Sequence, residues 1–400
     1  MAMLSVEEAE ARVLSLCAPL EAEAAAIDEA IDRALAEDVA AARTLPPWDN
    51  SAMDGYALRH ADLASGRPLA VTQTIFAGQA PTKAVGAFEC ARIMTGAALP
   101  PGADTVVMQE RVSRSGDAIT VAEVPAPGAN VRRRGEDVEA GVKLFSAGTP
   151  VGLAEAGALW AQGLTAVRVH RRPTVAIAAS GDELAPVGTP PGDRIVDTNS
   201  PVIAAAARRA GALVTPLGLA ADRLDALEAL FARGLEHDVL ITVAGASVGE
   251  RDFTRDAFER LGVSLDFFKV AMKPGKPLAV GRKGKTLIFG LPGNPVSAMV
   301  TFERFVRPAL RRLQGLPPGP RLVPGRAAVA LSGSPTLRLF VRAHAVLRDG
   351  ALWATPLSSQ SSGAMASATG ATHLVSLPPG TGTVTAGSEI ELLELTWLRA

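Results

Sequence analysis

The chain has 400 residues, of which 48% are hydrophobic and 20% are charged. This length exceeds what one hydrophobic core usually supports, and the composition excludes a largely disordered chain. Lys and Arg (40) almost balance Asp and Glu (41), so the net charge of -1 creates no general attraction for nucleic acid or for an anionic membrane.

The beginning of the chain and its cysteines indicate where the protein works. The first residues, MAMLSVEEAEARV, are acidic and lack the features of a signal peptide, and the apolar runs are too short to cross a bilayer. The two cysteines form no CxxC pair, and the five histidines show no metal-binding spacing. We therefore expect a cytoplasmic protein that binds neither nucleic acid nor a membrane.

The first 163 residues combine helical segments with a β-rich region. Ser5 and Glu8 form a capping box before a helix expected over residues 6–17, and EAEAAAIDEAIDRALAEDVA (21–40) predicts a second helix. From about residue 45 to 142, Gly, Pro and short β-type runs predict a small domain of hairpins. A further helix is expected over 153–163.

Strand and helix patterns then alternate. The expected strands cover 174–180, 212–219, 238–245 and 285–290, and the expected helices cover 201–211, 223–236, 253–262 and 295–315. This alternation indicates βαβ units in a mostly parallel, doubly wound sheet, which binds ligands where strands lead into helices. The Pro/Gly-rich segment 315–325 is interpreted as a linker to a compact domain of short strands.

Acidic side chains follow several predicted strands. Asp182 and Glu183 lie in SGDEL, the segment DTNSP occupies 197–201, and Asp252 ends GASVGERD. Carboxylates gathered at one edge of a sheet could share Mg²⁺, which prefers oxygen ligands. Helix capping is the alternative, and it is the more frequent role when each residue is taken singly.

Two further loops of the α/β region could hold an anion. Lys269, Lys273 and Lys276 surround a Pro-Gly turn, where they could bind phosphate or another oxyanion, or form an ordinary solvated basic turn. GLPGNPVSA (290–298) leads from a strand into the N-terminus of a helix, which favours anions. The loop matches neither GxxxxGK[ST] nor GxGxxG, so it does not support an ordinary ATPase or dinucleotide site.

The β-rich region contains three polar segments. Residues 45–59 place Asp49 and Asp54 beside the only tyrosine, residues 92–110 place Thr95 on a turn, and NVRRRGEDV (130–138) sets three arginines beside two carboxylates. Turn chemistry or surface ion pairs would explain each segment alone. Carboxylates, lysines and helix N-termini suit metal-assisted handling of phosphate or another oxyanion better than covalent catalysis.

Seven segments in this order resemble motifs of the molybdopterin molybdenumtransferases, the family that includes the C-terminal enzymatic domain of gephyrin. They are DNSAMDGYA (49–57), RIMTGA (92–97), NVRRRGED (130–137), SGDEL (180–184), KPGKP (273–277), GLPGNPVSA (290–298) and QSSGAMASATGA (360–371). The resemblance extends over about residues 5–398.

The resemblance implies a multidomain α/β plus β fold and an elongated homodimer of four-domain subunits. The implied domains are a split helical/β first domain (1–44 and 143–172), a mostly β second domain (45–142), an adenylyltransferase-like, molybdopterin-binding α/β domain (173–316) and a C-terminal β-barrel (317–400). The active cleft would lie between the α/β domain and the second domain of the partner subunit. That arrangement would bring Asp54, Thr95 and Asp137 to the cleft.

The reaction that the resemblance implies inserts molybdenum from molybdate into adenylylated molybdopterin and releases AMP, with Mg²⁺ assisting. It assigns Glu183, Asp222 and Asp252 to Mg²⁺ or the adenylate phosphate, and Lys269, Lys273 and Lys276 to molybdate and the pterin phosphate. The other ligand-binding residues that it implies are Gly181, Asp182, Ser247, Gly249, Pro292, Gly293, Asn294, Pro295, Ser297, Arg342 and Ser362.

Some positions depart from the family pattern, and two other functions stay open. Ala244-Gly245 replaces two glycines and Ser180 replaces a threonine, changes that keep the side chains small. The alternatives are an adenylyltransferase or pyrophosphatase of the same α/β superfamily and a non-catalytic, gephyrin-like scaffold. Molybdopterin adenylyltransferase, molybdoenzymes and cofactor chaperones are the conceivable partners besides a second copy, and tungstate is a conceivable substrate.

Overall fold

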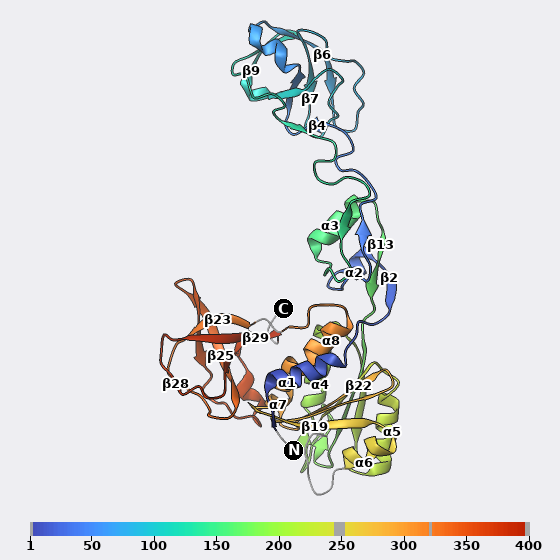
Figure 1. Ribbon diagram of the computed structural model, residues 1–400, viewed down its shortest axis with the longest axis vertical. Helices are drawn as coiled ribbons and strands as arrows, with labels where there is room; N and C mark the ends of the chain where they lie inside the picture. Colours follow the sequence, from blue (N-terminus) through green and yellow to red (C-terminus); the bar gives the residue numbers. More distant parts are fainter. Residues whose placement is uncertain (1–2, 244–252, 320–321, 397–400) are drawn as a thin grey trace. The chain divides into compact units, whose positions relative to one another are not determined.

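The computed structural model describes residues 3–243, 253–319 and 322–396 (Figure 1). The chain divides into two compact units. Unit 1 contains Met1–Ala36, Gly148–Leu153 and Ala166–Ala400, and unit 2 contains Glu37–Ala147 and Ala154–Thr165. None of the described helices has the length and apolar character needed to cross a bilayer.

A seven-stranded sheet forms the centre of unit 1, in the order β1-β19-β21-β22-β18-β14-β17. Its strands are β1 (Met3–Leu4), β14 (Thr174–Ser180), β17 (Leu213–Ala220), β18 (Val239–Val243), β19 (Ser264–Val270), β21 (Pro277–Lys283) and β22 (Thr286–Leu291). The four predicted strands, β14, β17, β18 and β22, lie side by side and parallel. Strand β21, which the sequence analysis did not identify, runs antiparallel to both of its neighbours.

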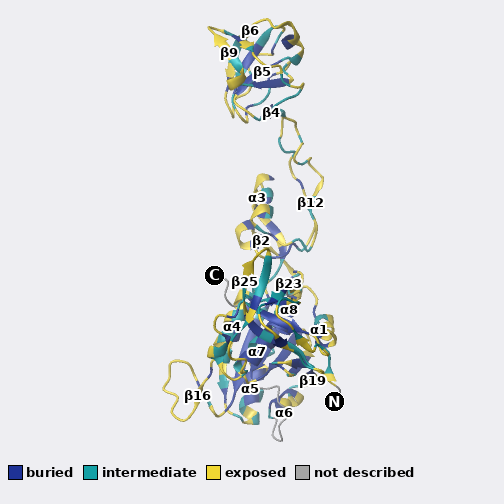
Figure 2. Ribbon diagram, turned by 90° about the vertical axis from the view of Figure 1, so that its left-hand side faces the viewer, coloured by how far each residue is buried: buried dark blue, intermediate teal, exposed yellow. Residues whose placement is uncertain are grey.

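Helices cover both faces of this sheet, as the doubly wound prediction requires. Val175 and Ile177 of β14 pack into one hydrophobic core, whereas Ala176 and Ala178 pack into the other. The first core receives α4 (Asn199–Arg209), α7 (Pro295–Thr301) and α8 (Arg307–Leu313), and the second receives α5 (Leu224–Gly234) and α6 (Phe253–Arg260). Successive side chains of a strand point to opposite faces, so the central strands are buried on both sides (Figure 2).

The N-terminal segments confirm one prediction and contradict another. Helix α1 (Val6–Ser15) begins at the Ser5–Glu8 capping box. The second predicted helix is wrong, because Ala22–Ala26 forms strand β2, and only Ile27–Ala30 is helical (α2). Strand β2 pairs with β13 (Ala166–His170), which supplies backbone hydrogen-bond partners from a distant segment and overrides the high helix propensity of Ala and Glu.

The predicted C-terminal β-barrel is confirmed. Strands β25 (Arg338–Arg348), β26 (Ala351–Pro356), β23 (Leu322–Ala327), β29 (Glu389–Glu394) and β27 (His373–Leu377) follow one another, and β27 closes back on β25. The linker predicted over 315–325 is therefore too long, since β23 already begins at Leu322.

Unit 2 contains the predicted domain of short strands. Its six-stranded sheet has the order β8-β5-β7-β6-β10-β9. The strands are β5 (Gly55–Leu58), β6 (Leu69–Ile75), β7 (Glu89–Ile93), β8 (Thr105–Met108), β9 (Val112–Ser115) and β10 (Ala118–Val121). Helix α3 (Leu153–Ala161) occupies the position expected for it. The finer division of the chain into four domains stays a prediction.

The ion pair between Arg171 and Asp238 stabilises the large sheet at the amino ends of β14 and β18. The two terminal nitrogens of Arg171 contact the two carboxylate oxygens of Asp238 at 2.6 and 2.7 Å. Asp238 also accepts hydrogen bonds from the backbone N–H (2.8 Å) and the hydroxyl (2.9 Å) of Thr174, at the start of β14. Burial alone would raise the pKa of Asp238, but these hydrogen bonds outweigh it and hold the pKa below its ordinary value of 3.8.

The replacement Asp238→Asn tests this contribution to stability. An acid with a lowered pKa in the folded state stabilises the fold above its ordinary pKa, and that stabilisation disappears as the pH falls through the folded-state value. We expect a loss of about 2 kcal/mol at pH 7, because the Asp238 carboxylate is mostly buried and accepts hydrogen bonds from both Arg171 and Thr174. Denaturant unfolding at pH 7 and at pH 3 measures this loss.

The difference between the wild type and Asp238→Asn should shrink at the lower pH. Glu228→Gln is the control, because Glu228 pairs with Arg260 on the surface, and we expect a much smaller change. An equal loss at both pH values would contradict the assignment of the stabilisation to the ionised carboxylate.

Candidate functional site

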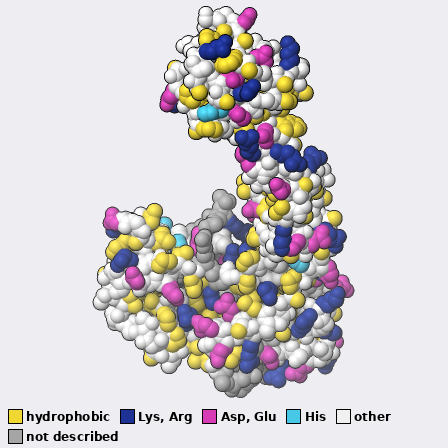
Figure 3. All heavy atoms as spheres, turned by 45° about the horizontal axis from the view of Figure 1, so that its top comes forward, with side chains coloured by type: hydrophobic (Ala, Val, Ile, Leu, Met, Phe, Trp, Pro, Cys, Tyr) yellow, Lys and Arg dark blue, Asp and Glu magenta, His cyan; other side chains and the backbone are white. Residues whose placement is uncertain are grey.

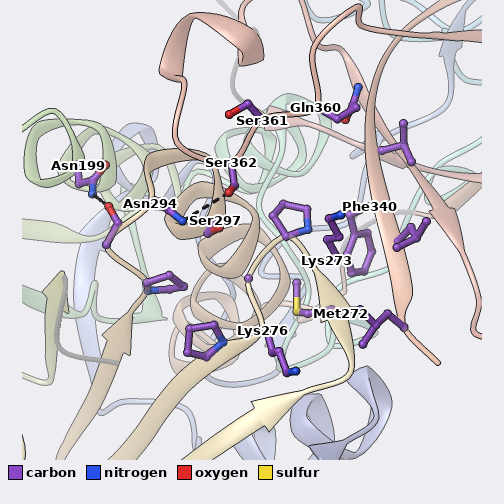
Figure 4. Close-up of a pocket in the computed structure, with 18 of the residues that line it drawn as sticks. Asn199, Met272, Lys273, Lys276, Asn294, Ser297, Phe340, Gln360, Ser361 and Ser362 are labelled. Atoms are coloured by element: carbon purple, nitrogen blue, oxygen red, sulfur yellow. Dashed lines mark hydrogen bonds between the residues drawn. The ribbon is translucent and has the colours of Figure 1, made fainter. Parts of the chain in front are cut away.

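A hollow of about 1270 Å³ lies in unit 1 between the carboxyl ends of the sheet strands and the barrel (Figure 4). Its walls come from the loops after β14 and β22, from the Lys-Pro-Gly turn 273–277, and from barrel residues of β25 and the loop 360–362. Glu183, Lys273 and Ser297, which are far apart in the sequence, all line it. Four of the segments that resemble family motifs, 180–184, 273–277, 290–298 and 360–371, thus meet at one site.

The Lys-Pro-Gly turn is held against the barrel. Strand β20 (Met272–Lys273) is parallel to β25, with Met272 opposite Arg338 and Lys273 opposite Leu339. Gly275 has a φ of +97°, and a Cβ atom there would lie 2.6 Å from the Thr301 hydroxyl, so only glycine fits. Lys273 and Lys276 flank this turn and line the hollow (Figure 4), whereas Lys269 lies exposed on β19 outside the lining.

The loop 290–298 contacts the barrel through two hydrogen bonds. The Asn294 side-chain amide donates to the Ser362 hydroxyl at 3.4 Å (Figure 4), and the Val296 N–H donates to the Ser362 carbonyl at 3.1 Å. The expectation that the N–H groups of this helix N-terminus are available to an anion is therefore wrong for Val296. Ser297 is 5% exposed and lines the hollow with Pro292, Gly293 and Asn294, whereas Pro295 does not.

The segment DTNSP contributes two residues that were not assigned to the site. The Asp197 carboxylate accepts hydrogen bonds from the N–H groups of Asn199 and Ser200 at 3.1 and 3.0 Å, so the capping alternative is correct for Asp197. The Asn199 side chain donates to the Gly293 carbonyl at 2.7 Å. Both residues line the hollow. Nothing local in the sequence indicates the contact between Asn199 and Gly293.

Carboxylates gather at the ends of β14 and β17. The Asp222 N–H donates to the Asp182 carboxylate at 3.2 Å. Partial burial, followed by the charges of Asp182 and Glu183, raises the pKa of Asp222. Gly181 lies beneath the Glu183 carboxylate, where a Cβ atom would approach to 2.7 Å. Of these residues only Glu183 lines the hollow, and the carboxylates repel one another in the absence of a counter-ion.

No group of three or more His, Cys, Asp or Glu side chains in the described ranges is arranged to hold a metal ion. Mg²⁺ commonly uses only one or two protein carboxylates, with water and substrate phosphate completing its shell. The neighbouring carboxylates of Asp182, Glu183 and Asp222 offer the negative charge and the oxygen ligands that this kind of Mg²⁺ binding requires. Asp252, Ser247 and Gly249 fall outside the residues that the structure describes.

Arg342 lies behind the hollow rather than in its lining. Its side chain is fully buried and donates to the carbonyls of Ser359 (3.0 Å), Ser361 (3.1 Å) and Ser367 (3.3 Å). No carboxylate of the described residues pairs with it, one terminal nitrogen has no hydrogen-bond partner, and burial lowers its pKa. The direct contact expected of Arg342 is thus corrected: it shapes the loop that carries Ser361 and Ser362.

Strands β20 and β25 supply an apolar wall that the sequence did not indicate. Met272, Leu339 and Phe340 line one side of the hollow, and Gln360 and Ser361 lie above them (Figure 4). The amide of Gln360 exchanges two hydrogen bonds with the backbone of Arg342, at 3.0 and 2.9 Å. Met272, Leu339 and Phe340 lie in no motif, whereas Gln360 and Ser361 begin the segment 360–371 that resembles a family motif, and the folded barrel brings both groups to the site.

The three polar segments of unit 2 come together in that unit. Strand β4 (Asn50–Ser51) pairs with β11 (Val131–Arg132), and Ser51 exchanges backbone hydrogen bonds with the 96–97 turn. Asp54 accepts hydrogen bonds from the backbone N–H (2.7 Å) and the hydroxyl (2.8 Å) of Thr95, which lower its pKa. Asp137 is exposed, and its backbone N–H donates to the Leu45 carbonyl at 3.1 Å. Whether this cluster reaches the cleft of a partner subunit stays a prediction.

Charges of both signs are distributed over the surface. On the face in Figure 3, Lys and Arg side chains of the described residues alternate with Asp and Glu. An anionic ligand would therefore be attracted by the local lysines of the hollow rather than by a general field.

Three family models match successive parts of the chain. The model described as the MoeA N-terminal region (domain I and II) matches residues 4–163. The probable molybdopterin binding domain matches residues 176–312, and the MoeA C-terminal region (domain IV) matches residues 324–395. Together they cover most of the chain.

Relatives and solved structures agree with these models. Molybdopterin molybdenumtransferase of Haemophilus influenzae is 40% identical over 320 residues, which cover 78% of each chain. Molybdopterin molybdenumtransferase 2 of Mycobacterium tuberculosis is 37% identical over 414 residues, which cover 98% of this chain and 100% of that protein. The molybdopterin biosynthesis moeA protein from Pyrococcus horikoshii OT3 superposes with a TM-score of 0.86 at 25% identity, covering 98% of this chain and 100% of that one. The chain belongs to the molybdopterin molybdenumtransferase family.

Proposed function

We propose that the protein inserts molybdenum from molybdate into adenylylated molybdopterin, releases AMP and thereby forms the molybdenum cofactor. Membership of the family makes it a transferase of molybdenum cofactor biosynthesis. The observation that carries the finer proposal is the single hollow lined by Glu183, Lys273 and Ser297. It combines positive charge, hydroxyl donors and a carboxylate edge.

The anionic parts of the substrates would lie at the lysine turn. Lys273 and Lys276 offer point charges to molybdate and to the pterin phosphate, and the hydroxyls of Ser297 and Ser362 can donate hydrogen bonds to their oxygens. The buried guanidinium of Arg342, which lacks a carboxylate partner among the described residues, adds positive potential behind the 359–362 loop. The planar pterin has the apolar wall of Met272, Leu339 and Phe340 available to it.

Magnesium would be held by Glu183 and Asp222, with water and the adenylate phosphate as further ligands. When bound, it would neutralise charge on the phosphate oxygens during transfer. The raised pKa of Asp222 supports this assignment, because a divalent cation relieves the repulsion between neighbouring carboxylates.

The rival α/β enzymes explain less of the site. Adenylyltransferase or pyrophosphatase activity would explain the sheet and its loops. It would not explain the residues of the apolar wall or those of the loop 359–362, which we call the serine loop. A non-catalytic scaffold would not need Lys273, Lys276 and Glu183 in the lining of one hollow. The test below separates all three functions.

The central test measures AMP release from adenylylated molybdopterin with and without molybdate. We expect release that depends on molybdate, and a loss of at least about tenfold in Lys273→Ala, because one charge-assisted contact is worth about 1.4 kcal/mol or more. Lys285→Ala is the matched control, since Lys285 lies at the opposite end of β22 and should leave the rate unchanged.

Other outcomes of this assay identify the rivals. Transfer of AMP from ATP to molybdopterin would favour the adenylyltransferase. No turnover by the wild type would favour the scaffold. Full activity in Lys273→Ala and in Glu183→Ala would instead exclude the hollow as the site of the reaction.

Replacement of Asp222 tests the magnesium proposal. Asp222→Asn removes one of the crowded charges, so we expect a higher melting temperature without Mg²⁺, on the order of 2 °C, and a smaller rise on adding Mg²⁺ than the wild type shows. Asp225→Asn is the control, because Asp225 pairs with Arg223 outside the cluster. An undiminished Mg²⁺-induced shift in Asp222→Asn would exclude Asp222 as a ligand.

Homodimer formation with a shared site supplies a further test. If Asp54 acts on the hollow of the partner subunit, Asp54→Ala and Lys273→Ala should each be inactive alone but should recover up to about a quarter of wild-type activity after subunit exchange, because one of the two sites in a mixed dimer is intact. No recovery in mixtures that form dimers would place both residues in one subunit's site.

A further inference from the structure

Residues 3–10 lie against two walls of the hollow, although they are far from them in the sequence. Strand β1 is parallel to β19, and the Leu4 carbonyl accepts a hydrogen bond from the Ala271 N–H at 2.7 Å. The Ala271 carbonyl in turn accepts from the Arg338 N–H at 2.8 Å, where β25 begins. A continuous set of backbone hydrogen bonds therefore connects the N-terminal segment, the lysine turn and the barrel.

Helix α1 adds a first ion pair to this connection. The Glu7 carboxylate lies 2.7 Å from the Arg338 guanidinium, whose side chain is 17% exposed. Arg338 also donates to the Ser376 hydroxyl at 2.9 Å and lies 3.9 Å from Glu391, and both of these residues belong to the barrel. Of these contacts only Glu7 links the arginine to a part of the chain outside the barrel.

A second ion pair lies one turn further along α1. The Glu10 carboxylate is 2.7 Å from Arg304, whose side chain is only 8% exposed. The Arg304 guanidinium carbon lies 5.6 Å from the ring centre of Phe340, which lines the hollow. Glu10 thus neutralises a buried charge that packs directly against the apolar wall.

We infer that residues 3–10 act as an N-terminal clamp that sets the spacing between the lysine turn and the barrel wall, with Glu7 and Glu10 as positioning residues. The direct pairing of β20 with β25 involves only two residue pairs, so the contacts of residues 3–10 add to the shared hydrophobic core in fixing the distance between Lys273 and Phe340. Small displacements at such a site change binding strongly. The kinetic part of this inference rests on the proposed function, whereas its structural part does not.

The test compares two carboxylates that share one arginine. Glu7→Gln removes the link to α1, and Glu391→Gln removes the charge within the barrel, while Arg338 keeps hydrogen-bond partners in both variants. In Glu7→Gln we expect amide hydrogen exchange at Ala271 and Arg338 to accelerate about fivefold and the KM for molybdate to rise about threefold with kcat nearly unchanged. Glu391→Gln should change neither quantity.

Three results would overturn the clamp. Equal effects of Glu7→Gln and Glu391→Gln would mean that only the charge balance of Arg338 matters. Faster exchange in Glu7→Gln with an unchanged KM for molybdate would show that the clamp does not control the geometry of the binding site. Unchanged exchange would show that the clamp does not stabilise the hydrogen bonds at Ala271 and Arg338. If the wild type shows no molybdate-dependent AMP release, the proposed function fails, and the exchange measurement alone decides between the clamp and its absence.

Discussion

The junction between the large sheet and the barrel, which includes the short pairing of β20 with β25, is the constraint on which the hollow depends. Sheet and barrel each have their own strands and much of their own core, so each could satisfy its backbone hydrogen bonds without the other. They are joined by the β20–β25 pairing, by hydrogen bonds such as that from Val296 to Ser362, and by a shared hydrophobic core that includes Phe340, Leu374 and Leu393, and a cavity remains between their facing surfaces. The lysines, serines and apolar side chains of the site become neighbours only through this junction.

The two ends of the large sheet illustrate a division between stability and function. At the amino ends of the strands, Arg171 and Thr174 satisfy the Asp238 carboxylate. At the carboxyl ends, Asp182, Glu183 and Asp222 crowd together, and the pKa of Asp222 is raised instead of lowered. Such uncompensated charge reduces stability in the free protein, and it is typical of sites that bind a cation or react with a charged substrate.

Arg342 shows that a residue can serve a site without lining it. A fully buried guanidinium bonded to three carbonyl groups fixes the course of the serine loop and brings a positive charge close to the hollow. Arg304 and Arg338, which pair with Glu10 and Glu7 of the clamp, also lie next to the lining: Arg304 packs against Phe340, and Arg338 is the first residue of β25. The geometry of the hollow therefore depends on cations that are themselves held by carbonyls and carboxylates outside it.

By itself the sequence determined the parallel strands β14, β17, β18 and β22, the capped helix α1 and the C-terminal domain of strands. It also determined which segments supply the polar side chains. Hydrophobic periodicity, helix capping and turn chemistry are local properties, so they can be recognised without the tertiary structure. Tertiary structure decided the rest. It made β2 a strand through pairing with β13, bonded Asn199 to Gly293, turned Val296 towards Ser362 and placed Arg342 behind the serine loop. In each case the deciding partner lies far away in the chain, so no local pattern could reveal it.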